Sequence, residues 1–563
     1  MFNIYYQKNN NSVLFNTFKE NGLDHIQNYI PLYRKFFNLQ PGNYQSINLN
    51  QHYNITSVDK TDNKNKFSCT IQSQDKKLKT EAFFKFSPLL DPIKYMIGKY
   101  GELEDTQKTA LPVLPTETHN CHAKVMDPNN SAYVDGFFTY LTSNLLHTHN
   151  FIHGVDFFGA FLAIHKKFDV DILDDIEYLN ESVYFHENRN KLFDVHITDE
   201  DLFVEGNTRN YRKKLAIGDN VKTTDILKID DDMFDGVFSS GGNKCTEHIT
   251  EELVAEYCAE NPKNTSNKTN DSRCSSRSSH TSLDTNLDQD SEEDDGEDED
   301  GDTDSELSSI DSAIDCRATI PNFPVQIICL ESMDATLDSL LDEDMSNEEW
   351  ASCLFQVIMT LIAYQKMFAF THNDLHTNNI MYSPTDLQYI IYKYDKVYYK
   401  VPTYGRLFKI IDFGRAIYKF KGNLIFSDSF HPKGDAATQY NCEPYMNPRK
   451  PRLDPNYSFD LCRLACSLYD YFMDVLEDDF DTNPIAKLIE TWCTDDKNRN
   501  ILYKKDGEER YPDFKLYKMI ARAVHNHEPH KYVTHQVFSK FVSNRKKCKK
   551  KKVINIDDLP SYV

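Results

Sequence analysis

Two short polar motifs contain the residues of this 563-residue sequence that are best suited to chemistry. The first, THNDLHTNNIM, follows a long apolar stretch and contains His372, Asp374 and Asn379. The second, DFG, begins at Asp412 directly after the apolar run FKII. Magnesium prefers hard oxygen ligands, so Asp412 and Asn379 are candidate metal ligands. Asp374 can accept the proton of a substrate hydroxyl, and Gly414 permits a close backbone turn after the metal ligand.

The elements that flank these motifs can be predicted from sequence patterns. Ser346 and Glu349 form a capping box, and apolar residues at helical spacing follow, which predicts a core helix that leads into the first motif. YIIYKY, KVYYKV and RLFKII predict strands between the two motifs, with 383–406 as a Tyr-rich inserted hairpin. A further helix is predicted near Asp460, with one apolar face formed by Leu461, Leu464, Leu468 and Phe472.

The first part of the chain has the patterns of a small sheet and one helix. NITSV, KFSCTIQ and KTEAFFKF, within 54–86, are rich in β-branched or aromatic residues and predict three strands. Apolar residues at helical spacing predict a helix over 131–146. VDFFGAFLAI (155–164) and VQIICL (325–330) predict two more strands.

In this order, H-x-D-x-x-x-x-N and D-F-G resemble the catalytic loop and the metal-binding motif of eukaryotic-type serine/threonine protein kinases. The resemblance implies phosphoryl transfer from ATP, with Mg²⁺, to protein serine or threonine hydroxyls. It implies that Asp374 acts as catalytic base, that His372 props the catalytic loop by hydrogen bonding, and that Asn379 and Asp412 hold the metal. It also implies an α+β, bilobal protein-kinase-like fold with a small antiparallel sheet in the N-lobe and a mainly helical C-lobe.

The resemblance also assigns a lysine and an acid to the nucleotide site. Lys85, inside the third predicted strand, matches the lysine that pairs with the nucleotide phosphates, although no VAIK pattern surrounds it. The alternative for Lys85 is an exposed lysine of a strand. Asp135 matches the helix acid that pairs with this lysine, and Glu102 and Glu104 are rivals for that place.

Two more positions follow from the resemblance. Leu330 and Glu331 come directly after the fifth strand, where the family has the hinge whose backbone binds adenine. Asp460, in FDLCRLA, resembles the buried aspartate of the family's central helix, which braces the backbone of the catalytic loop. The alternative for Asp460 is a helix N-terminal residue favoured by the helix dipole.

These assignments divide the chain into five parts, because its length exceeds what one core requires. They are an N-terminal extension (1–47), the first part of the N-lobe (48–164), an insert (165–322), the remainder of the N-lobe with the hinge and the C-lobe (323–530), and a C-terminal tail (531–563). Within the insert, residues from about 265 to 315 are polar and acidic and almost lack large apolar side chains. Such a segment cannot bury enough surface to offset its ordering entropy, so we expect it to be disordered.

The charge balance restricts the expected partners. The chain has 63 Lys and Arg against 87 Asp and Glu, a formal net charge of −24. This argues against nucleic-acid binding by the whole body, because phosphate contacts need clustered cations. The basic run RKKCKKKK (545–552) is a candidate contact for an acidic partner, including the acidic run at 291–306, although blocks of like charge are usually disordered.

The cysteines and the apolar runs indicate a compartment. The 13 cysteines show no paired framework, and no signal peptide or membrane-spanning run of about 18 apolar residues is visible. We therefore expect an intracellular protein without membrane contact. The departures from the kinase pattern given below resemble those of divergent serine/threonine kinases of large DNA viruses such as the mimivirus group. The Asn-, Lys-, Ile- and Tyr-rich composition fits an AT-rich genome of that kind. This resemblance implies the host cytoplasm.

Three departures from the kinase pattern keep other functions open. The turn SVDKTDNKNK has no glycines, Asp374 and Asp412 are 38 positions apart, and CEPYMNP (442–448) stands where A-P-E is expected. One alternative is a small-molecule phosphotransferase of the aminoglycoside or choline kinase type, because DLHTNN, with His376, resembles the D-L-H-x-x-N loop of those enzymes. The other is a non-catalytic pseudokinase that acts as a scaffold.

Overall fold

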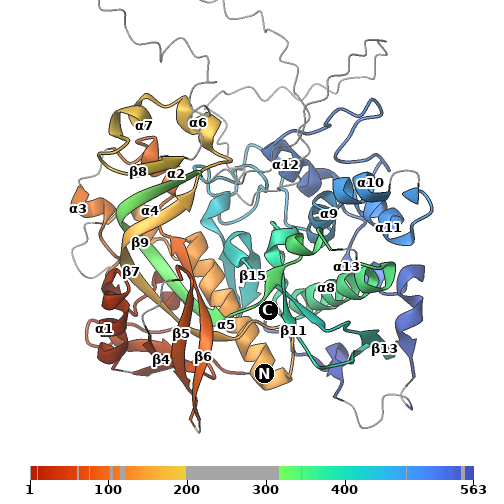
Figure 1. Cartoon of the computed structure of the whole chain (residues 1–563), viewed down its shortest axis with the longest axis horizontal. Coiled ribbons are helices and arrows are strands. Elements are labelled where there is room, and N and C mark those ends of the chain that lie inside the picture. Colours follow the sequence, from red (N-terminus) through yellow and green to blue (C-terminus); the bar gives the residue numbers. More distant parts are fainter. Residues whose placement is uncertain are drawn as a thin grey trace, which may run out of the picture. The chain divides into compact units, whose positions relative to one another are not determined.

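The structure is a computed structural model with a mixed α+β fold of helices and mainly antiparallel sheets (Figure 1). The residues that it describes are 2–8, 10–59, 63–74, 76–101, 105–114, 121–197, 316–343, 345–476, 479–544, 546 and 552–563. All of them belong to one compact unit, formed by 1–206 together with 272–563. The predicted disordered segment and the rival acids Glu102 and Glu104 lie outside the described residues.

The largest sheet has seven strands, and its neighbouring strands are antiparallel. Six of them follow one another in the order β2-β7-β9-β6-β5-β4, and β8 pairs with β9. Their bounds are β2 (Leu23–Gln27), β4 (Asn54–Val58), β5 (Lys66–Gln72), β6 (Lys77–Pro88), β7 (Phe157–Asp171), β8 (Asp194–Ile197) and β9 (Cys316–Glu331). The predicted strands at 54–58 and 66–72 are confirmed, because alternating burial along β5 matches its alternating sequence.

This sheet extends past the boundaries that the sequence suggested. β7 and β9 remain paired from Phe157 opposite Leu330 to Asp171 opposite Arg317, so positions 165 and 322 both lie inside paired strands. β8 joins them from the region assigned to the insert. Segment 1–47 supplies β2, an edge strand of the sheet, together with α1 (Ser12–Glu20) and β1 (Tyr6–Lys8), which pairs with β3 (Ile47–Leu49). The N-terminal extension is therefore part of the same packed unit.

Helix α5 (Ser131–His149) lies against this sheet (Figure 1). Asn130 caps it by accepting a hydrogen bond from the amide of Ala132, and the first fourteen residues after Ser131 are buried. Five short helices also lie in this part of the chain: α2 (Pro92–Met96), α3 (Asp105–Lys108), α4 (Ala123–Met126), α6 (Ile176–Asn180) and α7 (Val183–Asn188). A helix buried almost all round is typical of a core position, so Asp135 is held in the interior beside the sheet.

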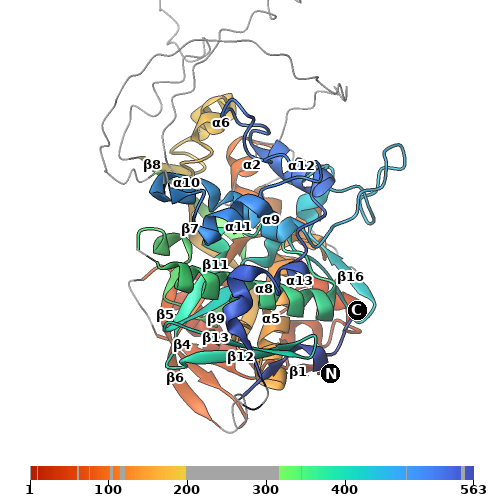
Figure 2. The same ribbon diagram turned by 90° about the vertical axis from the view of Figure 1, so that its right-hand side faces the viewer.

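The part of the molecule that follows β9 is mainly helical and is called the helical half. Helix α8 (Asn347–Phe368) is its central helix (Figure 2). The predicted capping box is present, since the Ser346 hydroxyl accepts from the amide of Glu349 and the Glu349 carboxylate accepts from the amide of Ser346. Within the described residues, α8 is also the one helix long and apolar enough to cross a membrane, and 94% of its most apolar window is buried inside the protein.

The remaining helices of this half are short. They are α9 (Phe459–Cys466), α10 (Tyr469–Leu476), α11 (Pro484–Trp492), α12 (Phe514–Ala523) and α13 (Pro529–Tyr532). The prediction of one helix from Asp460 through Phe472 is wrong. The helix ends at Cys466, where the amides of Ser467 and Leu468 turn back to nearby carbonyls, and α10 begins at Tyr469. The apolar stripe therefore continues over two helices.

Three smaller sheets lie near the motifs. One is the pair β15 (Ile417–Phe420) and β16 (Asn423–Phe426), which follows the second motif. The other two are larger. The first has the order β10-β11-β14, formed by β10 (Ala335–Thr336), β11 (Ile380–Pro384) and β14 (Arg406–Ile410). The second has the order β17-β13-β12-β18, formed by β12 (Tyr389–Tyr394), β13 (Val397–Pro402), β17 (Val542–Ser543) and β18 (Ile554–Asn555). The predicted hairpin is therefore present, and the C-terminal tail supplies a strand to each of its edges. Most of the basic run 545–552 between those two strands lies outside the described residues.

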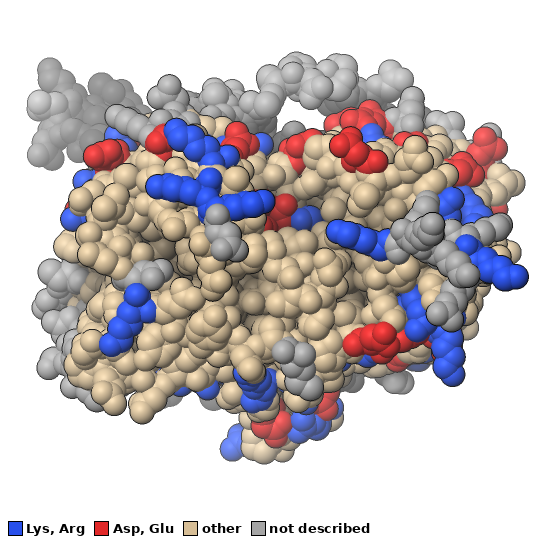
Figure 3. All heavy atoms as spheres, turned by 90° about the horizontal axis from the view of Figure 1, so that it is seen from below, with Lys and Arg blue, Asp and Glu red and all other residues tan. Residues whose placement is uncertain are grey.

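One cluster of buried apolar side chains runs through the large sheet, α5 and α8. Phe138 is at its centre and contacts the rings of Phe370 and Phe413, at 4.4 and 4.7 Å between centroids. On the surface, the face shown in Figure 3 carries charged residues of both signs, and much of its centre is formed by other residue types. The shared core fixes α5 relative to the two polar motifs.

Candidate functional site

The loop that carries the first motif is held by a buried carboxylate. α8 ends at Phe368, and the following Ala369 and, further on, Asn373 take left-handed backbone conformations, with φ of 48° and 65°. Asp460, from α9, is fully buried and accepts hydrogen bonds from the amides of His372 and Asn373, each at 2.9 Å. Burial raises the pKa of Asp460, whereas the His372 side chain and these amides oppose that effect. The bracing contact predicted for Asp460 is present.

Further contacts join the loop to the second motif. The His372 ring hydrogen-bonds through Nε2 to the carbonyl of Ile411 at 2.8 Å, and its Nδ1 accepts from the amide of Asp374 at 3.3 Å. The amide of Ile411 in turn donates to the carbonyl of Asn379 at 3.0 Å. Because Ile411 directly precedes Asp412, these bonds set the two motifs in register. His372 therefore contacts both motifs, and its role in supporting the loop stays a prediction.

Asn379 faces back into the loop. Its side-chain nitrogen donates to the carbonyl of Asp374 at 2.8 Å and to Nε2 of His376 at 3.1 Å. Burial lowers the pKa of His376 to about 4, so this ring is neutral near pH 7 and can accept that bond. The side-chain oxygen of Asn379 is then the atom left for a ligand.

Lys85, Asp135 and Asp412 form a charged cluster between β6, α5 and the second motif. Nζ of Lys85 lies 2.7 Å from Oδ2 of Asp135 and 2.8 Å from Oδ1 of Asp412. The side chains are 29%, 4% and 38% exposed, respectively, so Asp135 is the interior member and Asp412 the one that faces solvent. The alternative of an exposed, unpaired Lys85 is wrong. The amide of Phe413 also donates to Oδ1 of Asp135 at 2.9 Å, which ties α5 to the second motif.

The pKa values of the three members of this cluster are shifted in different directions. Burial disfavours the charged Lys85, but Asp135 and Asp412 outweigh it and raise the lysine pKa. Burial raises the pKa of Asp135, because this carboxylate is removed from water. For Asp412, burial is outweighed by Lys85, which holds its pKa below the usual range. At neutral pH we therefore assign the negative charge that faces the cavity to Asp412.

A cavity of ≈ 230 Å³ joins this cluster to the first motif. Its charged lining residues are Lys85, Asp91, Lys124, Asp135, Asp374, Asp412, Arg415 and Asp435. The sequence predicted four of these. His372 and Asn379 are not among the lining residues and make the loop contacts described above.

The two predicted hinge residues lie apart from that cavity. Leu330 is buried at the end of β9, and the carboxylate of Glu331 pairs with Nζ of Lys409 at 2.5 Å. The amide of Glu331 donates to the carbonyl of Asp156 at 3.0 Å, and its carboxylate accepts from the amide of Asp156 at 2.7 Å. The backbone amide and the carboxylate of Glu331 are therefore both engaged in contacts within the protein. A role of Leu330 and Glu331 in nucleotide binding stays a prediction.

Sequence reasoning missed three residues around Asp374. Arg415 directly follows DFG, and its Nη2 pairs with Asp435 at 2.7 Å while its Nη1 lies 3.6 Å from Oδ2 of Asp374. Tyr517, from α12, donates its hydroxyl to Oδ1 of Asp374 at 2.8 Å. The adjacency of Arg415 to DFG was a usable signal. The contact between Tyr517 and Asp374 spans 143 positions, and no sequence signal indicated it.

The segment after the second motif is attached to the start of α5. Asp428 pairs with Nζ of Lys124 at 2.5 Å and accepts from the amide of Ser131 at 2.9 Å. Burial raises the pKa of Asp428, and Lys124 opposes that shift. This ion pair holds a second lysine in the lining of the cavity.

Other clusters in the described part of the chain offer less chemistry. No group of three or more His, Cys, Asp or Glu side chains among the described residues is arranged to hold a metal by itself. Cys462, Cys466 and Cys493 are buried neighbours in the helical half, as expected for small apolar residues in a core.

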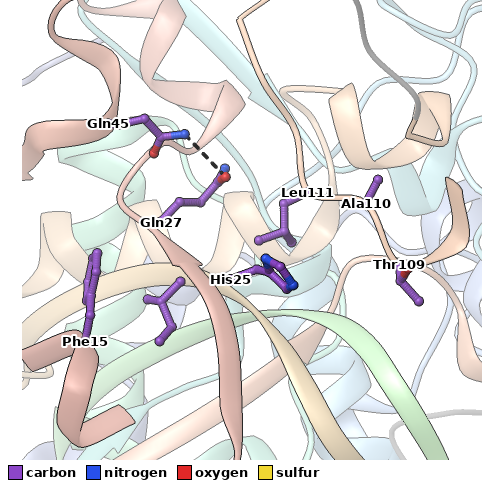
Figure 4. A pocket seen from close by; sticks show the side chains of 8 residues that line it. Phe15, His25, Gln27, Gln45, Thr109, Ala110 and Leu111 are labelled. Atoms are coloured by element: carbon purple, nitrogen blue, oxygen red, sulfur yellow. Dashed lines mark hydrogen bonds between the residues drawn. The ribbon is translucent and has the colours of Figure 1, made fainter. Parts of the chain in front are cut away.

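A second cavity, of ≈ 570 Å³, lies beside the edge strand β2 and is shown in Figure 4. Its lining includes Gln27 and Gln45 with His25 as its ionisable side chain, and none of the predicted site residues.

Comparisons with known proteins give partial similarities. No protein-family model matches the chain. Over 95 residues, 16% of this chain, it is 37% identical to a probable serine/threonine-protein kinase of Dictyostelium discoideum. Over 178 residues, 31% of this chain, it is 27% identical to an uncharacterized protein of Invertebrate iridescent virus 6. The matches span 8% and 26% of those proteins, respectively. Part of the chain is thus similar to a probable kinase, and part to a viral protein.

Proposed function

We propose that this protein transfers the terminal phosphoryl group of ATP to serine or threonine hydroxyls of a protein substrate. The observation that carries this proposal is the common cavity of Asp374 and Asp412, in which Asp412 also contacts the paired lysine Lys85. Phosphoryl transfer requires positioning and charge neutralisation more than covalent chemistry from the protein. Asp374 is held in its loop, whereas Asp412 faces solvent and contacts Lys85. This arrangement suits that requirement.

The arrangement of elements supports a bilobal, protein-kinase-like fold for this activity. A mainly antiparallel sheet with one buried helix supplies Lys85 and Asp135. The loop after α8 and the turn after β14 supply Asp374 and Asp412. The partial similarity to a probable serine/threonine-protein kinase supports the same activity.

Asp412, which lines the cavity, and Asn379, which lies outside its lining, would hold a hard divalent cation. The Asp412 side chain is 38% exposed, and Asn379 has its side-chain nitrogen occupied, which leaves its oxygen as a ligand. When bound, Mg²⁺ neutralises charge on the phosphate oxygens. Lys85 would then exchange its contact with Asp412 for a phosphate oxygen while keeping Asp135 as its partner.

Asp374 completes the proposed reaction. It is 6% exposed, and its Oδ2 has Arg415 at 3.6 Å, which is longer than a hydrogen bond. This oxygen accepts the hydroxyl proton as the hydroxyl oxygen forms its bond to the terminal phosphorus. The bond from that phosphorus to the bridging oxygen breaks, and ADP leaves with the bonding electron pair.

The direct test is incubation of the purified protein with labelled ATP and Mg²⁺, beside the Asp412→Asn variant. Protein acceptors, aminoglycosides and choline are offered in parallel. We expect label on the protein acceptors with the wild-type chain and a loss of that label with the variant. Equal labelling by both, or no labelling of any acceptor by the wild type, contradicts the proposal.

A small-molecule phosphotransferase is the second candidate. The observation that favours it is the contact between His376 and Asn379, which places the D-L-H-x-x-N pattern in one compact loop. Label on an aminoglycoside or on choline, without label on protein, would select this function.

A non-catalytic pseudokinase that acts as a scaffold is the third candidate. The turn between β4 and β5, residues 59–65, contains no glycine whose backbone could approach phosphates closely. The absence of a thermal shift with millimolar ATP and Mg²⁺ would favour the scaffold and would contradict both ATP-dependent transferases.

A further inference from the structure

A tyrosine from a distant helix contacts the carboxylate that we assign as the base. The Tyr517 hydroxyl lies 2.8 Å from Oδ1 of Asp374. Tyr517 belongs to α12, whereas Asp374 belongs to the loop after α8. No motif in the sequence connects them, and the proposed reaction assigns Tyr517 no part.

The surroundings of Tyr517 fix the position of its hydroxyl. The residue is 4% exposed, and its ring lies parallel to that of Phe514, with centroids 5.4 Å apart and an angle of 18° between the planes. The guanidinium of Arg463 lies 4.9 Å from the ring centroid and that of Arg415 lies 5.5 Å from it. A ring held between a second aromatic ring and two cations has little freedom to rotate away from Asp374.

The direction of the hydrogen bond also follows from these contacts. Burial raises the pKa of Tyr517, so its hydroxyl remains protonated at neutral pH. The hydroxyl is the donor in its bond to Oδ1 of Asp374, and the guanidinium of Arg463 near the ring, which can only donate, does not compete for that proton. The phenol proton is then directed to Oδ1 of Asp374.

We propose that Tyr517 is a positioning residue for phosphoryl transfer: its hydroxyl fixes Oδ1 of Asp374, so that Oδ2 remains turned to the cavity and receives the acceptor proton. This inference rests on the proposed function. Asp374 lines the cavity, and Tyr517 is absent from the lining, so the tyrosine approaches the carboxylate from the interior. It therefore supports the base from behind and does not occupy the place of the acceptor hydroxyl.

Loss of the hydroxyl should release the carboxylate. Arg415 is 3.6 Å from Oδ2 and already paired with Asp435, and a freed Asp374 can turn toward it. A displacement of about 1 Å at a reacting group costs on the order of 10²-fold in rate. We expect Tyr517→Phe to lower kcat about 10- to 100-fold. The KM for ATP should stay within about twofold, because no contact of Tyr517 reaches Lys85 or Asp412.

A matched control exists within the chain. The Tyr503 hydroxyl donates to Oδ1 of Asp470, also at 2.8 Å, in the helical half and outside the cavity. Tyr503→Phe removes the same kind of bond and should leave kcat and both KM values unchanged. Both variants keep the phenyl ring, so we expect melting temperatures that differ from each other by less than about 5 °C.

The full test measures kcat and KM for ATP and for the acceptor in wild type, both tyrosine variants, Asp374→Asn and the double variant Tyr517→Phe/Asp374→Asn. If Tyr517 acts through Asp374, Tyr517→Phe lowers kcat in the wild-type background and changes it less than about twofold in the Asp374→Asn background. A merely structural tyrosine would cause the same fold-loss in both backgrounds.

The outcomes separate this inference from the function on which it rests. Wild-type turnover that depends on Asp412, together with an unchanged kcat in Tyr517→Phe, overturns the role of Tyr517 and leaves the proposed function standing. A higher kcat in Tyr517→Phe also overturns it, because the hydroxyl would then be inhibitory. Absence of any Asp412-dependent turnover in the wild type overturns both.

Discussion

The two halves of the candidate site are stabilised in different ways. The loop at 371–379 is held by hydrogen bonds from its backbone to the fully buried Asp460. The cluster of Lys85, Asp135 and Asp412 is held by charge pairs between side chains, and one of its carboxylates is 38% exposed. The loop is thus fixed by the interior of the helical half, whereas the cluster keeps one partner in contact with solvent.

This difference separates residues that maintain the site from residues that are free to exchange partners. Removal of Asp460 would leave two buried amides without acceptors, and each such loss costs about 1–3 kcal/mol. Neutralising Asp412 would leave Lys85 paired with Asp135 at 2.7 Å. Stability and activity should therefore fall together when Asp460 is removed, whereas neutralising Asp412 should lower activity and leave stability nearly unchanged.

The strongest test of this comparison is Asp412→Asn. We expect a loss of phosphoryl transfer of about 10³-fold or more, because the variant removes a charge placed to neutralise a metal–phosphate complex. The free energy of unfolding should change by less than about 1 kcal/mol, since Asp412 is part-exposed and Lys85 keeps a partner. Label transfer from ATP and urea unfolding measure the two quantities.

Asp169→Asn is a matched control for that variant. Asp169 is 32% exposed and pairs with Lys64 outside the cavity. Its neutralisation should leave label transfer unchanged. If Asp412→Asn retained wild-type turnover, the assignment of Asp412 to the metal would be wrong.

Asp460→Ala should affect both properties. We expect the free energy of unfolding to fall by about 2–4 kcal/mol, because the amides of His372 and Asn373 lose their acceptor in the interior. Activity should fall as well, even below the temperature at which the variant unfolds, because the loop that carries Asp374 loses its brace. Urea unfolding and label transfer at low temperature are the measurements. A variant as stable as the wild type would show that the loop is held by other contacts.

Lys85→Met would test the cluster from the side of the cation. Asp135 is 4% exposed, and without Lys85 its pKa, already raised by burial, should rise further. A carboxyl whose folded-state pKa is raised contributes stability below its unfolded pKa and loses it as pH increases through the folded pKa. We therefore expect a destabilisation of about 2–4 kcal/mol at pH 8 that decreases toward pH 5.

Urea unfolding of wild type and Lys85→Met at pH 5, 6, 7 and 8 measures this trend. Lys64→Met, which removes the exposed partner of Asp169, is the control and should show little dependence on pH. A destabilisation by Lys85→Met that is constant over this range would contradict the assignment of Asp135 as the buried acid of the cluster.

The parts of the structure that local patterns determine were predictable from the sequence. The strands at 54–58 and 66–72 and the helix start at Ser346 follow from residue alternation and from a capping box, both of which act over a few residues. The contacts of Lys85 with Asp135 and of Asp460 with the loop followed from the kinase resemblance, which supplied the long-range pairing.

Contacts without a motif could not be predicted. Tyr517 is a tyrosine at an ordinary helical position, and its pairing with Asp374 depends on how α12 packs against α9. The strands β17 and β18 are two residues long, too short to show a period, and they form because the hairpin offers two open edges. The break at Ser467 was missed because the apolar spacing continues through it.

The last expected effect concerns a histidine that connects the two halves. His153 follows α5, is fully buried, and its ring hydrogen-bonds to the carbonyl of Phe408 at 2.7 Å and to the hydroxyl of Tyr392 at 2.6 Å. Phe408 lies in β14, the strand that leads to Asp412, and Tyr392 lies in the inserted hairpin. Burial lowers the pKa of His153 to about 4.

Because the unfolded histidine has a pKa near 6.5, the unfolded chain binds this proton more readily than the folded one between pH 4 and 6.5. Stability should thus fall as pH decreases through that range, by about 1.4 kcal/mol per pH unit from this group. His153→Gln removes the titrating group, so its unfolding free energy should depend on pH less steeply than that of the wild type by this amount. Urea unfolding at pH 4.5, 5.5, 6.5 and 7.5 measures both slopes, and His530→Gln, at an exposed histidine, is the control. Equal slopes in wild type and His153→Gln would mean that this ring can take up a proton in the folded state, and that the connection between α5 and β14 tolerates a charge.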